Sequence, residues 1–235
     1  MRYDEYLFTS IGGKSVNEDS IRFCKTPGGI VAVVADGVGS NGGGDIASSI
    51  CADMIKDELP NCREKGDIFS LIKRANKAVI AHQTTAVQMK STIVTVDIRD
   101  ERTTFVHAGD SRGYVFRDSK LLFQTFDHSI PQMDVLRGNI TLEQIRFHPN
   151  RNKILRALGI DDVIPEISGE LKLKEGDAIL LCTDGFWEYV TEEEMAVDLA
   201  KSKSASVWTS YMLERIGKRI GSDNDNLSAI AIICG

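Results

Sequence analysis

Four short apolar runs, each next to an aspartate, constrain the fold of this chain more than any other feature. The aspartates follow the runs VAVVA, FVHAG and AILLCT and precede the run LSAIAIIC, at Asp36, Asp110, Asp184 and Asp225. A side chain at a strand end projects beyond the sheet, and a glycine beside it lets a backbone or ligand approach closely. A single Asp-Gly pair is more often a turn than a ligand, so the repetition is what favours converging carboxylates. Converging carboxylates repel one another unless they are protonated or neutralised by a cation.

The other apolar patterns divide the chain into short strands and amphipathic helices. Strands are expected at 5–11, 20–24, 30–35, 91–98, 103–109, 113–117, 120–126, 177–182 and 227–234. The four runs between 91 and 126 are joined by short turns, which predicts an antiparallel meander. Helices are expected from Asp45 to Pro60, at 67–86, 191–201 and 205–220, and in short pieces between 130 and 158, with Thr141 as an N-cap. Many antiparallel strands with paired helices predict an α+β fold in which sheet packs on sheet, flanked by helices.

Composition excludes several classes of protein. The chain has 235 residues, 42% of them hydrophobic and 26% charged, without repeats or linkers, so one domain spanning 1–235 is expected. A formal net charge of −6 leaves no basic footprint for nucleic acid and no polybasic run for a membrane. Five cysteines without a C-x-x-C spacing, no leader and no apolar run of about 18 residues predict a cytoplasmic protein.

The glycine-rich stretch after Asp36 has a competing interpretation. Gly37, Gly39 and Gly42 spell the G-x-G-x-x-G of a dinucleotide-binding turn. That fold needs a second parallel strand ending in an acid about 20 residues on, where this chain has the polar, proline-broken KDELPNCREKGD. IGGKS lacks the first glycine of a Walker loop, and SDNDN lacks the glycine and glutamate of an EF-hand loop. These three motifs are therefore rejected.

The aspartates favour a hard divalent cation. Carboxylates, water and an occasional backbone carbonyl suit Mg²⁺ or Mn²⁺, whereas zinc prefers histidine or cysteine. None of the four histidines is paired at a zinc-like spacing. Two hard cations bridged by an aspartate would activate a water and neutralise a phosphoryl group during in-line attack.

The order of the motifs resembles the metal-dependent serine/threonine protein phosphatases, the 2C-like or PPM family. The matching segments are NEDS (17–20), VVADGVGSNGGGDIAS (33–48), STIVTV (91–96), HAGDSRGYVF (107–116), FDHS (126–129), HPNRNKILRALG (148–159), LLCTDGFWEYV (180–190) and DNDNLSAIAI (223–232). Each motif alone is a weak signal, but eight in this order cover nearly the whole chain.

This resemblance implies a binuclear Mn²⁺ or Mg²⁺ centre, in some members with a weaker third ion. Asp36 would bridge two ions, the Gly37 carbonyl would complete one of them, and Asp184 and Asp225 would hold the other. The remaining implied residues are Glu18 and Asp19, which would orient metal-bound waters, and Asp110, which with Asp184 would form the third site.

The resemblance also implies a four-layer α-β-β-α sandwich of two antiparallel sheets with the ions in a cleft at one end. Residues 130–150 occupy the place of the flap of bacterial members, which influences substrate choice and metal turnover. Lys14 stands where the family has a phosphate-gripping arginine, so the charge remains but the bidentate fork is lost. Val38 stands where some eukaryotic members have histidine, so metal-bound water is expected to supply the leaving-group proton.

The implied activity is hydrolysis of phosphoserine and phosphothreonine in proteins, by a monomer that opposes a serine/threonine kinase. Because of Lys14, a second hypothesis stays open, a PPM-fold module that binds phosphoprotein but catalyses poorly. A third is a phosphatase of small phosphorylated metabolites.

Several further residues are expected to have structural roles. His82 is expected to pack on the buried stripe of its helix, and His128 and His148 to cap or anchor the flap. Arg112 is expected to brace the cleft or a neighbouring turn, Cys182 to lie in the core, and Phe186, Trp187 and Tyr189 to pack beneath the cleft.

Overall fold

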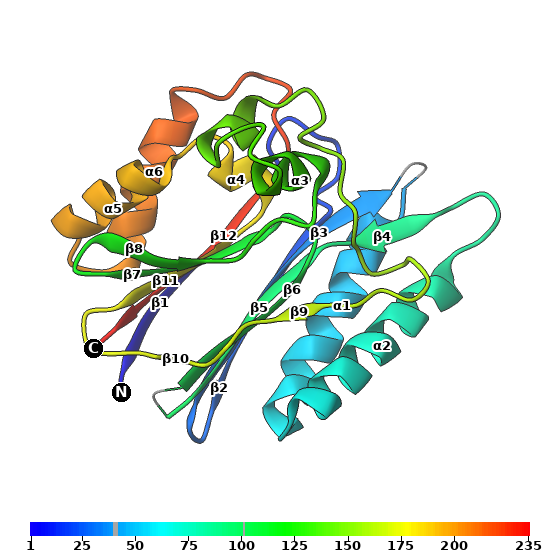
Figure 1. Cartoon of the computed structure of the whole chain (residues 1–235), viewed down its shortest axis with the longest axis horizontal. Coiled ribbons are helices and arrows are strands. Elements are labelled where there is room, and N and C mark those ends of the chain that lie inside the picture. The colour runs from blue at the N-terminus through cyan, green and yellow to red at the C-terminus, as the bar shows by residue number, and fades with distance from the viewer. Residues whose placement is uncertain (40–41, 101) are drawn as a thin grey trace.

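The computed structural model describes residues 1–39, 42–100 and 102–235, and these residues form two antiparallel sheets packed face to face (Figure 1). The first sheet has the order β1 (Tyr3–Ser10), β12 (Leu227–Cys234), β11 (Ala178–Cys182), β7 (Arg112–Arg117) and β8 (Lys120–Gln124). The second has the order β10 (Leu171–Lys172), β6 (Arg102–Ala108), β5 (Ile93–Arg99), β3 (Gly29–Gly39) and β2 (Asp19–Thr26). Two short strands extend it, β4 (Met89–Ser91) on β3 and β9 (Glu166–Ile167) on β6. Ser40 and Asn41 of the glycine-rich stretch lie outside the described residues.

Helices cover the outer face of each sheet (Figure 1). The second sheet is covered by α1 (Gly44–Glu58) and α2 (Lys65–His82), with the 3₁₀ turn η1 (Leu59–Asn61) between them. The first sheet is covered by α4 (Asp184–Trp187), α5 (Glu192–Lys201) and α6 (Ala205–Gly217). The segment before them holds α3 (Ile130–Leu136) and the 3₁₀ turn η2 (Glu143–Phe147). The predicted four-layer sandwich is confirmed.

The alternation of side chains along β3 explains why its apolar run is continuous. Val31, Val33 and Ala35 pack against α1 and α2, whereas Ile30, Ala32 and Val34 face the other sheet. Both faces of the strand are therefore covered, so the usual alternation of apolar and polar residues is absent.

The predicted meander between 91 and 126 is wrong in one connection. Strands β5 and β6 pair as expected, but β7 leaves their sheet and pairs with β11 in the other one. The turn between β6 and β7 crosses from one sheet to the other and contains Asp110. Short alternating runs identify strands but not their partners, because every strand buries the same kind of face.

Three local predictions are also wrong. Helix α2 ends at His82 rather than at 86, and His82 is exposed, with Nδ1 2.8 Å from the carbonyl oxygen of Ala78. The buried stripe of the helix stops at Val79, one turn earlier. Thr141 is not an N-cap, because η2 begins after Leu142.

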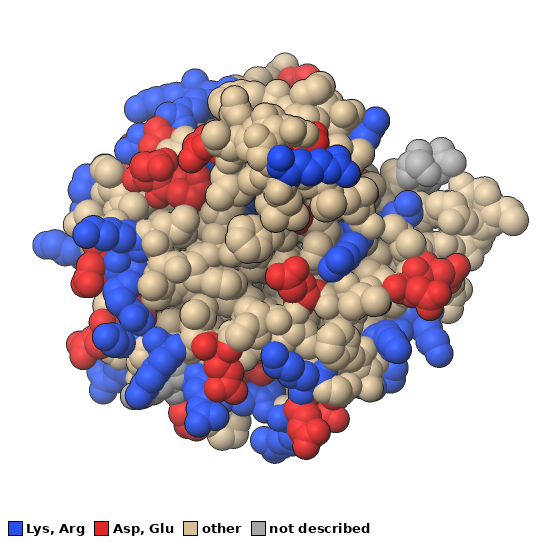
Figure 2. Space-filling view, viewed as in Figure 1, with Lys and Arg blue, Asp and Glu red and all other residues tan. Residues whose placement is uncertain are grey.

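Charges on the face shown in Figure 2 are mixed in sign. Lysine and arginine side chains alternate there with aspartate and glutamate side chains, and neither sign forms a continuous stripe on that face. A single-sign basic stripe is the usual footprint of a nucleic-acid-binding surface, and the visible face does not carry one.

Candidate active site

The carboxylates singled out in the sequence meet in one cleft at the end of the two sheets. The cleft has a volume of about 470 Å³, and its lining includes Lys14, Glu18, Asp36, Gly37, Asp110, Asp184 and Asp225. Asp19 is buried in β2, directly opposite Asp36 of β3 in the ladder between the two strands. The convergence that the repeated aspartates predicted is therefore present in the fold.

Each carboxylate is placed by a different element. Asp110 lies in the turn from β6 to β7, Asp184 begins α4 just beyond β11, and Asp225 lies two residues before the start of β12. Asp36 differs from the prediction, since β3 does not end there but continues to Gly39, where β4 pairs with it. The two sheets pack face to face, so the ends of these elements lie close together and border the same cleft.

The glycines beside Asp36 and Asp184 are required by backbone packing. A Cβ atom on Gly37 would lie 2.0 Å from the carbonyl oxygen of Gly44, and one on Gly185 would lie 2.1 Å from that of Asn226. No side chain fits at either distance. The two Asp-Gly pairs thus hold α1 and the loop before β12 close to the carboxylates.

The pKa values of the aspartates show the electrostatic strain in the cleft. Burial, and then repulsion from neighbouring aspartates, raises the pKa of Asp36 and that of Asp110 well above the ordinary value. Burial and the charge of Asp225 also raise the pKa of Asp184. The pKa of Asp19 is raised to about 7 by burial foremost and by the charge of Asp184. A divalent cation would relieve this mutual repulsion.

An unpartnered buried oxygen also fits a cation with its waters. Oδ2 of Asp19 accepts a hydrogen bond from Thr183 Oγ1 at 3.0 Å, but Oδ1 is buried and has no hydrogen-bond partner among the described residues. A buried carboxylate oxygen without a partner is costly unless a water or an ion completes it. Since Mg²⁺ and Mn²⁺ keep several waters, the residues present fit hydrated divalent ions.

Beneath the cleft, a buried ion pair fixes the turn that carries Asp110. Nε and an Nη nitrogen of Arg112 donate to the two carboxylate oxygens of Asp127 at 2.8 and 2.7 Å. The guanidinium of Arg112 lies 3.5 Å from the ring centroid of Trp187, whose Nε1 donates to the carbonyl oxygen of Asp110 at 2.9 Å. The bracing role predicted for Arg112 is confirmed.

The aromatic residues and the cysteine expected beneath the cleft are also in place. Phe186 and Trp187 are buried, and Tyr189 is half-buried beside them. Cys182 is fully buried, and this burial raises the pKa of its thiol, so it is a core residue as predicted.

The segment 130–150 is anchored to the body by the buried side chain of Arg146. Nε2 of His148 lies 3.5 Å from a carboxylate oxygen of Asp134, which belongs to the same segment, so the anchoring role expected for this histidine stays a prediction. Arg146, which the sequence did not single out, is buried, donates to the carbonyl oxygen of Trp187 at 3.1 Å and pairs with Glu192 at 2.9 Å. The periodicity of the surrounding residues holds no signal that Arg146 turns inward.

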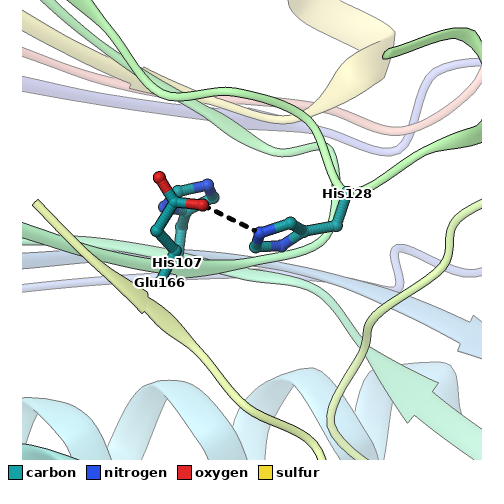
Figure 3. Close-up of side chains that lie close together, drawn as sticks. All are labelled: His107, His128 and Glu166. Atoms are coloured by element: carbon teal, nitrogen blue, oxygen red, sulfur yellow. Dashed lines mark hydrogen bonds and ion pairs between the residues drawn. The ribbon is translucent and has the colours of Figure 1, made fainter. Parts of the chain in front are cut away.

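A second cluster, at the edge of the second sheet, was also missed in the sequence. Among the described residues, His107, His128 and Glu166 are the group whose possible metal-ligand atoms all lie within 4.8 Å of one another (Figure 3). They come from β6, the loop after β8, and β9, so no sequence spacing links them. The two imidazole rings lie parallel, with centroids 4.7 Å apart.

The hydrogen bonds of this cluster argue against a metal ion. Nδ1 of His128 accepts a hydrogen bond from the backbone N–H of Gly109, so we assign the proton to Nε2, which lies 3.3 Å from Glu166. An Arg156 nitrogen also lies 3.1 Å from this Nε2. A metal ion at Nε2 would have to displace both the proton and the guanidinium. His128 therefore anchors the loop before α3, in agreement with its predicted role.

Comparison with known proteins identifies the family of the chain. The family model described as protein phosphatase 2C matches residues 9–227. The chain belongs to the protein phosphatase 2C family. The serine/threonine phosphatase stp of Listeria welshimeri is 27% identical over 204 residues, which span 83% of this chain and 81% of that protein.

Solved structures of the family share the whole fold. The S. agalactiae serine/threonine phosphatase is 25% identical, with a TM-score of 0.88 and full coverage of both chains. The catalytic domain of the serine/threonine protein phosphatase PstP, solved with two manganese ions, is 26% identical, with a TM-score of 0.80 over 99% of this chain and 97% of that one. The glycine-rich stretch of this family member is therefore not a dinucleotide-binding turn.

Proposed function

We propose that the aspartate-lined cleft is the active site of this chain, a metal-dependent protein phosphatase that hydrolyses phosphoserine and phosphothreonine. The observation that carries the proposal is the convergence of four aspartates from separate elements on one cleft. The manganese-bound relative supports two divalent ions as cofactors, Mn²⁺ or Mg²⁺. Bound there, two ions would lower the pKa of a water and neutralise charge on the phosphoryl group, so that water attacks phosphorus directly.

The residues that would hold the ions follow from their places in the cleft. Asp36 and the Gly37 carbonyl would hold one ion, Asp36, Asp184 and Asp225 the other, and Asp110 with Asp184 a weaker third. Glu18 accepts a hydrogen bond from the N–H of Gly44 at 3.1 Å, which fixes its carboxylate beside the cleft. With Asp19 it would orient waters bound to the ions.

The charged group offered to the substrate is Lys14. Its Nζ lies 3.3 Å from a carboxylate oxygen of Asp225, and its side chain is 45% exposed, so an incoming phosphate can reach it. Among the described residues that line the cleft there is no histidine, and Val38 stands where a histidine acid would be. The leaving-group proton would therefore come from water.

Domain organisation, partners and location are part of the proposal. We infer one catalytic domain spanning 1–235, with 130–150 as a flap, acting as a cytoplasmic monomer on phosphoproteins made by an opposing serine/threonine kinase. None of the described helices is long and apolar enough to span a membrane.

The non-catalytic binding module is not favoured, because the relatives are named as phosphatases and the aspartates are all retained. A panel of small phosphorylated metabolites would test the third hypothesis.

Phosphate release from a phosphothreonine peptide tests the activity. We expect release with added Mn²⁺, and at least tenfold less with EDTA, because the carboxylates alone supply no cation to neutralise the phosphoryl group. Equal release in both conditions would exclude the metal centre. Absence of release from folded, manganese-loaded protein would favour the binding module.

Replacing Lys14 by arginine tests its contact with phosphate. The planar fork of arginine binds two phosphate oxygens, so Lys14→Arg is expected to lower KM for the phosphopeptide about fivefold, with a smaller change in kcat. Lys25, which pairs with Glu5 at 2.8 Å in the β1–β2 region, provides the matched control, and Lys25→Arg should leave KM unchanged. An unaltered KM in Lys14→Arg would exclude Lys14 as a phosphate ligand.

A further inference from the structure

Two loops that meet at the cleft are packed backbone against backbone. These are residues 11–16, which carry Lys14, and residues 222–226, which carry Asp225. A Cβ atom on Gly12 would lie 2.2 Å from the carbonyl oxygen of Asp225, and one on Gly13 would lie 2.3 Å from that of Ser222. The N–H of Gly13 donates to the carbonyl oxygen of Asn224 at 3.0 Å. The close approach leaves no room for a side chain at position 12 or 13.

One side chain, that of Asn226, joins the two loops. Its Oδ1 accepts a hydrogen bond from the N–H of Glu18 at 2.9 Å, and its Nδ2 donates to the carbonyl oxygens of Ile11 and Val16 at 2.8 and 3.1 Å. Asn226 is only 6% exposed. Both ends of the loop bearing Lys14 are thus tied to one buried amide.

The same residue also orients Asp225. The backbone N–H of Asn226 donates to Oδ1 of Asp225 at 2.9 Å, and this is the oxygen that lies 3.3 Å from Nζ of Lys14. Lysine has four rotatable side-chain bonds and loses considerable entropy when it is held in one place. A rigid loop keeps the ammonium group of Lys14 near Asp225 before phosphate binds. Lys14 then loses less entropy on binding phosphate than it would on a mobile loop.

We propose that Asn226 is a positioning residue that holds Lys14 beside Asp225, so that the phosphate ligand and a metal ligand form one preassembled unit. The inference rests on the proposed function, in which Lys14 contacts the phosphoryl group. Asn226 itself does not touch the substrate. Its effect on phosphate binding passes through Lys14.

A double-mutant cycle on phosphate binding tests this coupling. Calorimetry would give the affinity of inorganic phosphate for the manganese-loaded wild type, Asn226→Ala, Lys14→Ala and the double variant, each at saturating Mn²⁺. We expect about tenfold weaker binding in each single variant. In the double variant, Asn226→Ala should add less than twofold, because residues acting through one contact are not additive. Asn226→Ser, which retains a small polar group, replaces Asn226→Ala if the latter does not fold.

Asn76 provides a matched control outside the cleft. It is also 6% exposed, its Nδ2 donates to the carbonyl oxygen of Ile160 at 2.9 Å, and its Oδ1 accepts from the N–H of Gly159 at 2.6 Å. Asn76→Ala should lower the melting temperature to a similar degree but leave phosphate affinity unchanged.

Three outcomes would overturn the inference: no phosphate binding by the wild type, additive effects in the double variant, or equal loss of affinity in Asn76→Ala. If the cycle behaves as expected while peptide turnover is absent, the inference stands and the proposed catalytic function fails.

Discussion

Asp36→Asn should lower kcat for a phosphothreonine peptide about 10³-fold, because it removes one charge from the carboxylate placed between the proposed ion sites. Four other acidic residues singled out in the sequence line the same cleft, and none stands in β3 to replace it. Asparagine has nearly the same shape, so the fold should remain. Steady-state kinetics over a range of Mn²⁺ concentrations would measure the loss and show whether excess metal restores activity.

The unfolding temperature of Asp36→Asn, which serves as the fold control, should change in a definite direction. Because burial and neighbouring charges raise the pKa of Asp36, its ionised form destabilises the metal-free protein. The metal-free Asp36→Asn variant should therefore unfold at the same or a higher temperature than the metal-free wild type. Full activity in the variant would eliminate Asp36 from the site, and a lowered melting temperature would mean that the loss of kcat reflects misfolding.

Arg112→Met should cost about 3–5 kcal/mol of the free energy of unfolding, because it leaves Asp127 buried without its cation. The side chains of Arg112 and Asp127 are 2% and 1% exposed, so solvent cannot take over the contact. Urea unfolding of the metal-free protein would measure the change. Adding Asp127→Asn to the same chain should recover most of the loss, since the uncompensated charge is then removed.

A surface pair with the same chemistry provides the comparison. Arg102 and Glu170 lie 3.6 Å apart, with side chains 75% and 61% exposed, so Arg102→Met should change the unfolding free energy little. If Arg112→Met lowered the free energy of unfolding as little as Arg102→Met does, the buried pair would not brace the turn that carries Asp110. A failure of Asp127→Asn to rescue Arg112→Met would instead indicate that the contact with Trp187 matters more than the charge.

Most of the elements could be predicted because each carries its signal within a few residues. The run VAVVA is continuous, and only Ser228 interrupts the run LSAIAIIC, because both faces of their strands are covered. The stripe from Ile68 to Val79 follows the helical period. The terminal turns were less predictable. His82 continues the helical pattern in the sequence, but α2 ends there and the buried stripe has already stopped.

The candidate site was predictable in its residue types and not in its assembly. Their positions beside apolar runs identified Asp36, Asp110, Asp184 and Asp225 as candidate site residues. The order of motifs added Glu18, Asp19 and Lys14 to this set. The sequence did not single out Asn226 or Arg146. Each of these buried side chains donates to backbone carbonyl oxygens of distant segments, so no local pattern marks it.

The sequence by itself determined the longer strands and helices, the acidic set and the family, because hydrophobic period and motif order are properties of neighbouring residues. Only the tertiary structure decided that β6 and β7 belong to different sheets and that His107, His128 and Glu166 meet. It also decided that Asn226 joins the loops of Lys14 and Asp225. These relations depend on which strand edges pair and which faces pack. Local sequence patterns do not encode either of these choices.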